Sequence, residues 1–341
     1  MVESPPMVEP RSMPPVPGSS LDQTICVTES AGECRHAGRS STWGPSPLTV
    51  TQAVFERFQR LIYGESGIWL ANSKKTLLCG RLAKRLRAVH ATTLADYHEL
   101  VTQPDQLAER LLMIDAITTN ETHFFRESKH FEFLVQEMVP RWRSQAGQQK
   151  RPRTIRVWSA GCSSGEEPYS LAMLLAAELP RCDDWEVEIL ATDISSRMLA
   201  TACRGIYSMV KSPDIPKHLL HRFMLKGIGG QQGQMKVTPE IQQMVKFARL
   251  NLSQGPYFIK EPCDLIFCRN VLIYFNSESK RKVVNNLAKC LSDDGLLLIG
   301  HAENLNGLTR SVRSLRPTIH CKAESYDRLA DEFQARRPRR K

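Results

Sequence analysis

Apolar residues recur at helical spacing between residues 49 and 117. Spacing of i, i+3 and i+4 is typical of amphipathic helices, whereas strands alternate apolar and polar residues. No strand-like alternation appears in this stretch, so we predict a small all-helical domain, placed with its exit segment at 48–130. The pattern predicts four helices, over 49–63, 72–89, 94–102 and 105–117.

The second predicted helix has an apolar face and a basic face. Asn72 and Ser73 offer an N-cap for it. At about 100° per residue, one stripe of this helix is apolar and consists of Leu78, Leu82, Leu86 and Val89. A neighbouring arc carries the basic residues Lys74, Arg81, Lys84 and Arg85. The residues alone fit a solvated face as well as a surface that binds an acidic partner.

From residue 154 onward the pattern changes to short apolar runs that alternate with helical segments. Such alternation is typical of a doubly wound, mainly parallel α/β sheet, which we place at 131–328. The predicted strands are 154–160, 187–192, 263–268, 295–300, 311–316 and 318–324, and the predicted helices are 168–179, 195–203 and 277–291.

The stretch 205–250 interrupts this alternation. It contains a helical segment at 217–223, a glycine-rich turn at 227–233, and strand-like segments at 234–238 and 244–251. Short strands next to a glycine turn predict an antiparallel hairpin. We therefore expect a small antiparallel β-subdomain inserted into the sheet domain.

The two ends of the chain differ in composition from the rest. Residues 1–47 contain eight of the twenty prolines, which predicts a disordered leader. Residues 329–341 read as a basic tail. No apolar run is long enough to cross a bilayer and no secretory signal is visible, so we expect a cytoplasmic protein that is not membrane-inserted.

The cysteine spacing and the net charge exclude some kinds of site and binding partner but do not select one. The ten cysteines show no CxxC spacing and read as reduced thiols. Cys26, Cys34 and His36 lack a fourth ligand, so we expect no metal. The net charge is +10, and the first fifty residues hold three basic and five acidic side chains, which leaves +12 on the remainder. A basic body suits nucleic acid, anionic lipid or an acidic protein surface, and charge alone does not choose among them.

The loop after the first predicted strand is the first candidate site. Gly161 and Gly165 allow close approach of a ligand to the backbone, and Pro168 suits the first position of a helix. Open α/β sheets bind nucleotides at such a loop. A phosphate would need bare amides and positive charge there, but Glu166 and Glu167 occupy the position, and neither GxxxxGK[ST] nor GxGxxG is present. Acidic residues suit a cationic ligand with an ammonium and a sulfonium, a description that fits S-adenosylmethionine.

Asp193 ends the second predicted strand of the sheet domain. A carboxylate at this position can accept hydrogen bonds from both hydroxyls of an unphosphorylated ribose. The alternative is that Asp193 caps the helix expected from 195. Together with the preceding loop, the position favours ribose binding.

Six motifs occur in a recognisable order. They are Thr118-Thr-Asn120-Glu-Thr122-His-Phe-Phe-Arg126-Glu, the loop at 161–168, Ala191-Thr-Asp193-Ile, Arg204-Gly-Ile-Tyr, Asn251-Leu252 and Cys268-Arg269-Asn270-Val-Leu-Ile-Tyr274-Phe275. Over about residues 50–325 the chain resembles the chemotaxis receptor methyltransferases of the CheR type. The resemblance implies a Rossmann-like S-adenosylmethionine-dependent methyltransferase sheet with an inserted β-subdomain, preceded by a helical domain.

The resemblance also implies roles for individual residues. Glu167 is expected to receive the methionine ammonium and Asp193 the ribose, and Arg126 either pairs with the methionyl carboxylate or forms a structural salt bridge to Glu127 or Glu167. Arg269 and Tyr274 are the candidate catalytic residues, expected nearest the incoming substrate. The implied contacts to S-adenosylmethionine, and to the product S-adenosylhomocysteine, are Asn120, Thr122, Arg126, Gly161, Glu167, Asp193, Asn251, Leu252, Arg269 and Asn270.

The implied substrates are glutamate side chains of methyl-accepting chemotaxis receptors, whose signalling domains are acidic helical bundles. The docking residues would be Lys74, Arg81, Lys84 and Arg85 on an enzyme that we expect to be a monomer. It stays open whether the β-subdomain binds a C-terminal receptor peptide by strand addition.

Three other functions compete with receptor methylation. One is a methyltransferase of the same fold that acts on a non-chemotaxis signalling protein. Another is a basic nucleic-acid-binding protein. The sequence argues against this function, because it contains no recognised nucleic-acid-binding motif and no Asn/Asp-Pro-Pro-Tyr/Phe tetrapeptide, which is typical of base methylation. The third is an adaptor that binds the cofactor without catalysis, which the full set of expected site residues disfavours.

Overall fold

The computed structural model describes residues 48–335. The expectations for the leader, for Cys26, Cys34 and His36, and for residues 336–341 lie outside the described residues. Among the described residues, no helix combines the length and the apolar character that a bilayer span requires.

Four α-helices form the first domain, as predicted. Their bounds are α1 Gln52–Ser66, α2 Lys75–Ala88, α3 Leu94–Val101 and α4 Leu107–Ile117. The side chain of Thr51 caps α1 by accepting from the backbone of Val54, and Gly67 ends it in the left-handed region at φ 73°. The apolar stripe of α2 packs into the domain core, where Leu78 and Leu82 are fully buried.

The start of α2 differs from the prediction. Asn72 and Ser73 do not cap it but lie in a 3₁₀ turn, Asn72–Lys74, and α2 begins at Lys75 without a side-chain cap. A 3₁₀ turn is a frequent way to satisfy the first amides of a helix. The prediction of an N-cap at these two residues was therefore wrong.

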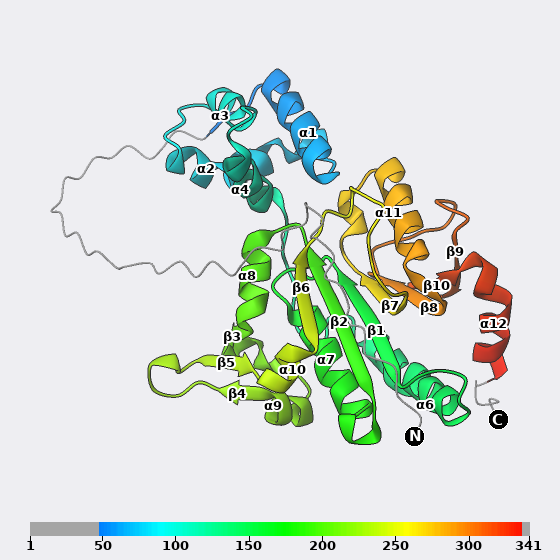
Figure 1. Cartoon of the computed structure of the whole chain (residues 1–341). Helices are drawn as coiled ribbons and strands as arrows, with labels where there is room; N and C mark the ends of the chain where they lie inside the picture. The colour runs from blue at the N-terminus through cyan, green and yellow to red at the C-terminus, as the bar shows by residue number, and fades with distance from the viewer. Residues whose placement is uncertain (1–47, 336–341) are drawn as a thin grey trace, which may run out of the picture. The chain divides into compact units, whose positions relative to one another are not determined.

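Seven strands form the main sheet, in the order β6-β2-β1-β7-β8-β10-β9 (Figure 1). The strands are β1 Thr154–Ala160, β2 Glu186–Asp193, β6 Val245–Arg249, β7 Cys263–Cys268, β8 Leu291–Ile299, β9 Val312–Arg316 and β10 Ile319–Lys322. Neighbours from β6 to β8 pair in parallel, and β10 pairs antiparallel with both β8 and β9. This confirms the predicted mainly parallel α/β sheet.

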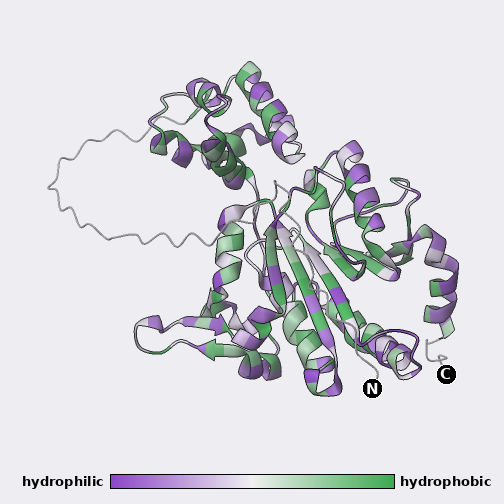
Figure 2. Cartoon of the chain, in the orientation of Figure 1, coloured by the Kyte–Doolittle hydropathy of each residue, from purple (hydrophilic) through white to green (hydrophobic). Residues whose placement is uncertain are grey.

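Alternate residues of the central strands face opposite sides of the sheet. In β7, Leu265 and Phe267 enter one apolar core, while Ile266 and Cys268 enter the other. Helix α7, Glu166–Glu178, contributes to the first core and α11, Ser277–Lys289, to the second. Because both faces are covered, the central strands are mainly apolar, and Figure 2 shows them largely green with purple positions in between. Helix α8, Ser196–Arg204, packs beside β2 and β6.

The inserted β-subdomain is a three-stranded antiparallel sheet in the order β3-β5-β4. Its elements are β3 Ile206–Ser208, a 3₁₀ turn Met209–Asp214, α9 Lys217–Phe223, β4 Met224–Lys226, a 3₁₀ turn Gly229–Gln231, β5 Gln234–Val237 and α10 Pro239–Gln243. The predicted glycine turn connects β4 to β5.

The predicted end of the insertion was wrong. The segment 244–250, which we assigned to the insertion, contains β6, and β6 pairs in parallel with β2 of the main sheet. The insertion therefore ends with α10. Apolar periodicity identifies a strand but not the sheet that it joins, because pairing depends on the partner strand.

Helices at two further places were not predicted. Residues 128–147 form α5 Ser128–Phe133, a π-helical stretch Leu134–Met138 and α6 Val139–Gly147. Helix α12, Tyr326–Ala335, occupies much of the segment that we assigned to the basic tail. Leu329 and Phe333 of α12 are buried in the main core, so the domain extends through this helix. The remaining 3₁₀ turns are Arg181–Asp183, Leu272–Tyr274 and Ala323–Ser325.

Candidate active site

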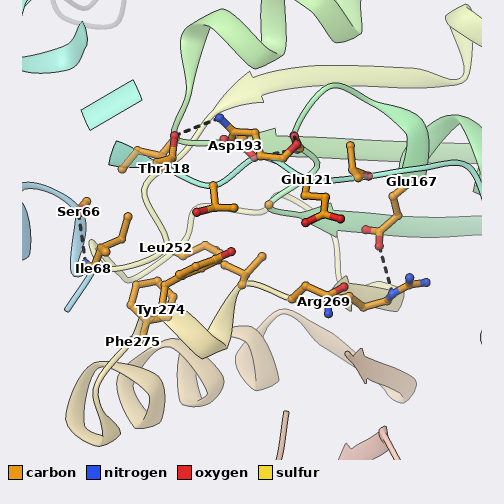
Figure 3. A pocket seen from close by; sticks show the side chains of 18 of the residues that line it. Ser66, Ile68, Thr118, Glu121, Glu167, Asp193, Leu252, Arg269, Tyr274 and Phe275 are labelled. Carbon is orange, nitrogen blue, oxygen red and sulfur yellow. Dashed lines mark hydrogen bonds and ion pairs between the residues drawn. The ribbon is translucent and has the colours of Figure 1, made fainter. Parts of the chain in front are cut away.

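A cleft with about 960 Å³ of empty space lies at the carboxyl ends of β1, β2 and β7 (Figure 3). Here the sheet extends from β1 in both directions, to β2 on one side and to β7 on the other, which is where open α/β sheets bind ligands. The structure brings all the expected cofactor and catalytic residues to this one cleft. They are Asn120, Thr122, Arg126, Gly161, Glu167, Asp193, Asn251, Leu252, Arg269, Asn270 and Tyr274.

The glycine loop is packed closely against a side chain from the loop after β7. Gly161 has φ 88°, and a Cβ added there would lie 2.4 Å from Cγ2 of Val271. Its amide donates to the carbonyl of Thr192 at 2.7 Å, which joins the loop to the end of β2. We predicted Pro168 at the first position of the helix. Helix α7 in fact begins at Glu166, so Pro168 is its third residue.

The two acidic residues of this loop have different environments. Glu166 is fully buried, accepts from the hydroxyl of Ser164 at 2.6 Å and pairs with Lys211. Glu167 lines the cleft and accepts from the hydroxyl of Ser159 at 2.7 Å. The expectation that both acids face a cationic ligand is therefore wrong for Glu166, and only Glu167 is available for one.

Burial shapes the charge of Glu167. It raises the pKa of this carboxyl above its ordinary value, and the nearby Arg269 guanidinium and the Ser159 hydroxyl offset only part of that rise. A cationic group that entered the cleft would favour the ionised form. Glu167 is thus suited to a ligand that brings its own positive charge.

Asp193 lines the cleft, and it does not supply the cap of the helix that follows it. Its Oδ2 accepts from the backbone N–H of Ser163 at 2.8 Å, and its Oδ1 accepts from that of Ser195 at 2.9 Å. The helix cap itself is Ser195, whose hydroxyl accepts from the amide of Met198. An ionised carboxylate offers about four acceptor positions, so two remain for a ligand in the cleft. Burial raises the pKa of Asp193, partly offset by these amides.

Arg269 is buried beside the acidic residues. Its side chain is 2% exposed, and its Nε lies 3.4 Å from Glu167 and 3.6 Å from Glu127. Its guanidinium also lies near the rings of Phe131 and Phe267. Nε and Nη1 are buried and have no hydrogen-bond partner among the described residues. These donors match the carboxylate of an amino-acid ligand whose ammonium reaches Glu167.

Arg126 does not form the salt bridge that was its alternative role. Its Nη1 donates to the backbone carbonyl of Glu121 at 3.0 Å, and within the described residues it forms no ion pair with Glu127 or Glu167. Arg269 pairs with both acids instead. Arg126 therefore keeps donors available for a ligand in the cleft.

Tyr274 lies in a 3₁₀ turn that the helical domain holds in place. Its carbonyl accepts from the amide of Trp69 at 2.9 Å, and Ile68 forms a β-bridge with Phe275. Its hydroxyl has no hydrogen-bond partner among the described residues. Taken alone, this tyrosine would be read as a core residue with a satisfied hydroxyl, and the structure does not support that reading.

Asn251 has a structural role as well as a place in the cleft. Its amide donates to the carbonyl of Glu65 at 2.7 Å and accepts from the backbone N–H of Ser253 at 3.0 Å. The side chain thereby ties the end of α1 to the loop after β6. The buried Leu252 beside it gives the cleft an apolar wall.

Sequence reasoning missed several residues that line the cleft. Ile194 directly follows Asp193 and could have been inferred from that position. Ser66 and Ile68 come from the end of α1, and no local signal marks them. They line the cleft only because the helical domain packs onto the loops after β6 and β7.

The basic stripe on α2 is only partly free. Arg85 donates to both carboxylate oxygens of Glu109, which is 8% exposed. Arg81 donates to the carbonyl of Ile117 and to the hydroxyl of Thr119. Lys74 and Lys84 are exposed. The expected docking surface of four basic residues is therefore reduced to two, because the arginines are used to hold α2 against α4 and the segment after it.

Both domains of the chain match models of one known protein family. The family described as "CheR methyltransferase, all-alpha domain" matches residues 53–118, and "CheR methyltransferase, SAM binding domain" matches residues 120–321. The Chemotaxis protein methyltransferase of Escherichia coli K12 is 37% identical over 274 residues, which cover 80% of this chain and 92% of the relative. Chemotaxis protein methyltransferase 2 of Pseudomonas aeruginosa PAO1 is 35% identical over 83% of this chain and 98% of the relative.

A third bacterium provides a similar match. The Chemotaxis protein methyltransferase of Borreliella burgdorferi is 34% identical over 276 residues, 81% of this chain and 96% of the relative. The similarity thus covers the helical domain, the sheet domain and the cleft between their loops, and it confirms the resemblance drawn from the six motifs. The chain belongs to the CheR methyltransferase family of S-adenosylmethionine-dependent methyltransferases.

Proposed function

We propose that this protein transfers a methyl group from S-adenosylmethionine to glutamate side chains of chemoreceptor signalling domains, as a cytoplasmic monomer. The products would be glutamate methyl esters and S-adenosylhomocysteine. The observation that carries the proposal is that Glu167, Asp193, Arg269 and Tyr274 share one cleft in a chain of this family.

The groups in the cleft fit the proposed cofactor. Glu167 suits its ammonium, the guanidinium groups of Arg269 and Arg126 suit its carboxylate, and Asp193 suits the ribose hydroxyls. When bound, S-adenosylmethionine supplies a methyl group activated by a sulfonium. Leu252 and Ile194 offer apolar surface to the adenine.

Catalysis in this cleft requires placement more than proton transfer. A free glutamate has a pKa of about 4.3 and is already ionised at neutral pH, so no general base is needed. A glutamate oxygen forms the new bond to the methyl carbon as the carbon–sulfur bond breaks. Tyr274 donates a hydrogen bond that orients the incoming carboxylate, and the cleft walls exclude water. Arg269, which was expected to hold the substrate, is buried beside Glu167 and we assign it to the cofactor.

Labelled cofactor tests the proposed reaction. Incubation of the protein with cell membranes that contain chemoreceptors and tritium-labelled S-adenosylmethionine should place label on the receptors. Mild base should release this label, because a methyl ester hydrolyses while a methylated amine or ring does not. Base-stable label on receptors, or label in RNA or DNA, would contradict the proposal. Label on a protein other than a receptor would favour the same chemistry in a different signalling system.

Replacing Tyr274 with Phe should lower turnover and leave cofactor affinity unchanged. A hydrogen bond to a charged group contributes about 1.5–3 kcal/mol, so we expect turnover to fall about 10-fold or more. Single-turnover kinetics and calorimetry with S-adenosylhomocysteine would measure the two quantities. Tyr326→Phe, at a tyrosine of α12 outside the cleft, is the control. An unchanged turnover in Tyr274→Phe would remove the proposed role.

Reversing the charge of Lys74 and Lys84 together should weaken receptor methylation. Both are exposed, and complementary charge mainly raises the rate of association. We expect kcat/KM for receptors to fall several-fold at low salt, and the difference to shrink as salt screens the charges. Binding of S-adenosylhomocysteine should not change.

A matched pair of exposed lysines controls for net charge. Lys150 precedes β1 and Lys260 precedes β7, so both lie at the edge of the sheet opposite the cleft. The double reversal Lys150→Glu and Lys260→Glu should leave receptor methylation nearly unaffected. Equal losses in the two double variants would show that α2 has no specific part in docking.

A further inference from the structure

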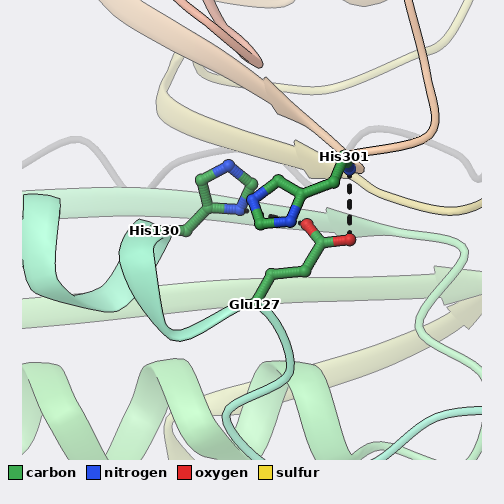
Figure 4. A group of neighbouring side chains, drawn as sticks. All are labelled: Glu127, His130 and His301. Atoms are coloured by element: carbon green, nitrogen blue, oxygen red, sulfur yellow. Dashed lines mark hydrogen bonds and ion pairs between the residues drawn. The ribbon is translucent and has the colours of Figure 1, made fainter.

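Three side chains with metal-ligating atoms meet beside the cleft but do not line it (Figure 4). Glu127 directly precedes α5, His130 lies on α5, and His301 follows β8. One ligand atom from each lies within 4.8 Å of the others. Glu127 and His130 are close in the chain, whereas His301 reaches them only through the fold.

The hydrogen bonds of His130 define its tautomer. Its Nε2 lies 2.7 Å from the hydroxyl oxygen of Thr318, and that hydroxyl donates its one hydrogen to the carbonyl of Pro317 at 2.6 Å. Nε2 must therefore carry a hydrogen and donate it. In a neutral imidazole the other nitrogen, Nδ1, is then a bare acceptor.

This acceptor faces another acceptor. Nδ1 of His130 lies 3.5 Å from Oε2 of Glu127, and neither atom has a hydrogen-bond partner among the described residues. His130 is 2% exposed, so bulk water does not compensate. Two electron-rich atoms that face each other in a buried place are unfavourable unless a positive group compensates both. The Arg269 guanidinium lies 3.6 Å from Oε2 of Glu127 but leaves Nδ1 of His130 without a partner.

We propose that Glu127, His130 and His301 bind a divalent transition-metal ion of the Zn²⁺ type. Zinc bonds to histidine nitrogen and carboxylate oxygen are about 2.0–2.2 Å long, so tetrahedral ligand atoms stand roughly 3.4 Å apart. The separation of 3.5 Å between Nδ1 and Oε2 agrees with that spacing. Imidazole and carboxylate together favour zinc over magnesium or calcium.

The third ligand and the surrounding groups suit such a site. His301 is exposed, so its ring provides both a nitrogen and a route for the ion to enter. Glu127 Oε1 accepts from the backbone N–H of His301 at 3.1 Å and from the amide of Asn270 at 3.4 Å. With Thr318 behind His130, both Glu127 and His130 have an outer partner that orients them. A fourth position is left for water.

Arg269 links this site to the cleft and opposes metal binding. Its Nε lies 3.6 Å from Glu127 Oε2 and 3.4 Å from Glu167. A metal ion at Glu127 would repel the guanidinium, which would keep Glu167 as its anionic partner. The affinity for the ion is therefore set by competition between a metal and an arginine for one carboxylate.

Titration of the full-length protein with Co²⁺, followed by visible absorption, tests the site without any measurement of activity. Binding of one ion in a tetrahedral nitrogen and oxygen environment is expected, with displacement by Zn²⁺. His301→Ala removes an exposed ligand with little effect on folding and should weaken Co²⁺ binding at least about 10-fold. His218→Ala, at an exposed histidine on α9, should bind like the unmodified protein.

Two results would overturn the proposal. One is equal Co²⁺ binding in the unmodified protein and in His301→Ala. The other is strong thiolate-to-cobalt charge-transfer absorption, which would place the ion at cysteines. Thr318→Val offers a further check, because it frees the tautomer of His130 without removing a ligand and should weaken binding by a smaller factor.

Discussion

Replacement of Asp193 with Ala should abolish measurable binding of S-adenosylhomocysteine. The buried carboxylate holds the amides of Ser163 and Ser195 on one side and presents its remaining acceptor positions to the cleft. Hydrogen bonds to a charged group contribute about 1.5–3 kcal/mol each. Loss of two such bonds to ribose hydroxyls predicts affinity at least about 100-fold weaker, which calorimetry would detect directly.

A substitution at the neighbouring Ser195 distinguishes the loss of a ligand contact from a general disruption of the loop. Ser195→Ala removes the cap of α8 but keeps Asp193, and loss of a cap costs about 1 kcal/mol of stability. We expect it to lower the melting temperature while cofactor affinity stays within a few-fold of the original. Tight binding in Asp193→Ala, or an equal loss in Ser195→Ala, would show that this carboxylate does not contact the ligand.

Replacement of Arg85 with Glu should strongly destabilise the helical domain. Glu109 is 8% exposed, accepts from the Arg85 guanidinium and also accepts from the hydroxyl of Tyr97 at 2.7 Å. The substitution leaves this buried carboxylate without its cation and adds a second negative charge. Breaking a buried pair in this way costs about 3–5 kcal/mol, which denaturant unfolding would measure.

The adjacent exposed residue provides the control. Lys84→Glu makes the same charge change one position away and should alter stability by no more than about 0.5 kcal/mol. Arg85→Lys, which keeps the charge but loses the two-pronged contact, should fall between them. If Arg85→Glu unfolds like Lys84→Glu, the ion pair is not a structural support. Reversal of Arg81 and Arg85 is therefore a poor test of receptor docking, because it would damage the domain itself.

The pairing of Glu167 with Arg269 bears on how the proposed cofactor binds. An amino-acid group brings one positive and one negative charge, so it can enter between a carboxylate and a guanidinium without leaving either uncompensated. The two side chains are already 3.4 Å apart, with the donors of Arg126 nearby. The site is thus largely organised before the ligand arrives, which lowers the entropy cost of binding.

Local sequence determined the elements and the chemical type of the cleft. Apolar periodicity predicted the four helices of the first domain and the strands of the sheet, because a residue's burial follows the geometry of its own helix or strand. The position of Glu167 and Asp193 after two adjacent strands also predicted their shared cleft. Parallel strands present their carboxyl ends at one edge of a sheet, so sequence order alone brings these residues together.

The tertiary structure decided which side chains are free to act. Glu166 and Glu167 are neighbours in the chain, yet one pairs with Lys211 and the other lines the cleft. From the sequence we expected Arg85 on a basic surface, but in the structure its guanidinium pairs with Glu109 of α4. The pairing of β6 with the main sheet and the meeting of His301 with His130 likewise depend on partners distant in sequence. Apolar periodicity indicates which side of its helix or strand a residue lies on. Ion pairs and ligand geometry depend instead on which other elements pack against that side.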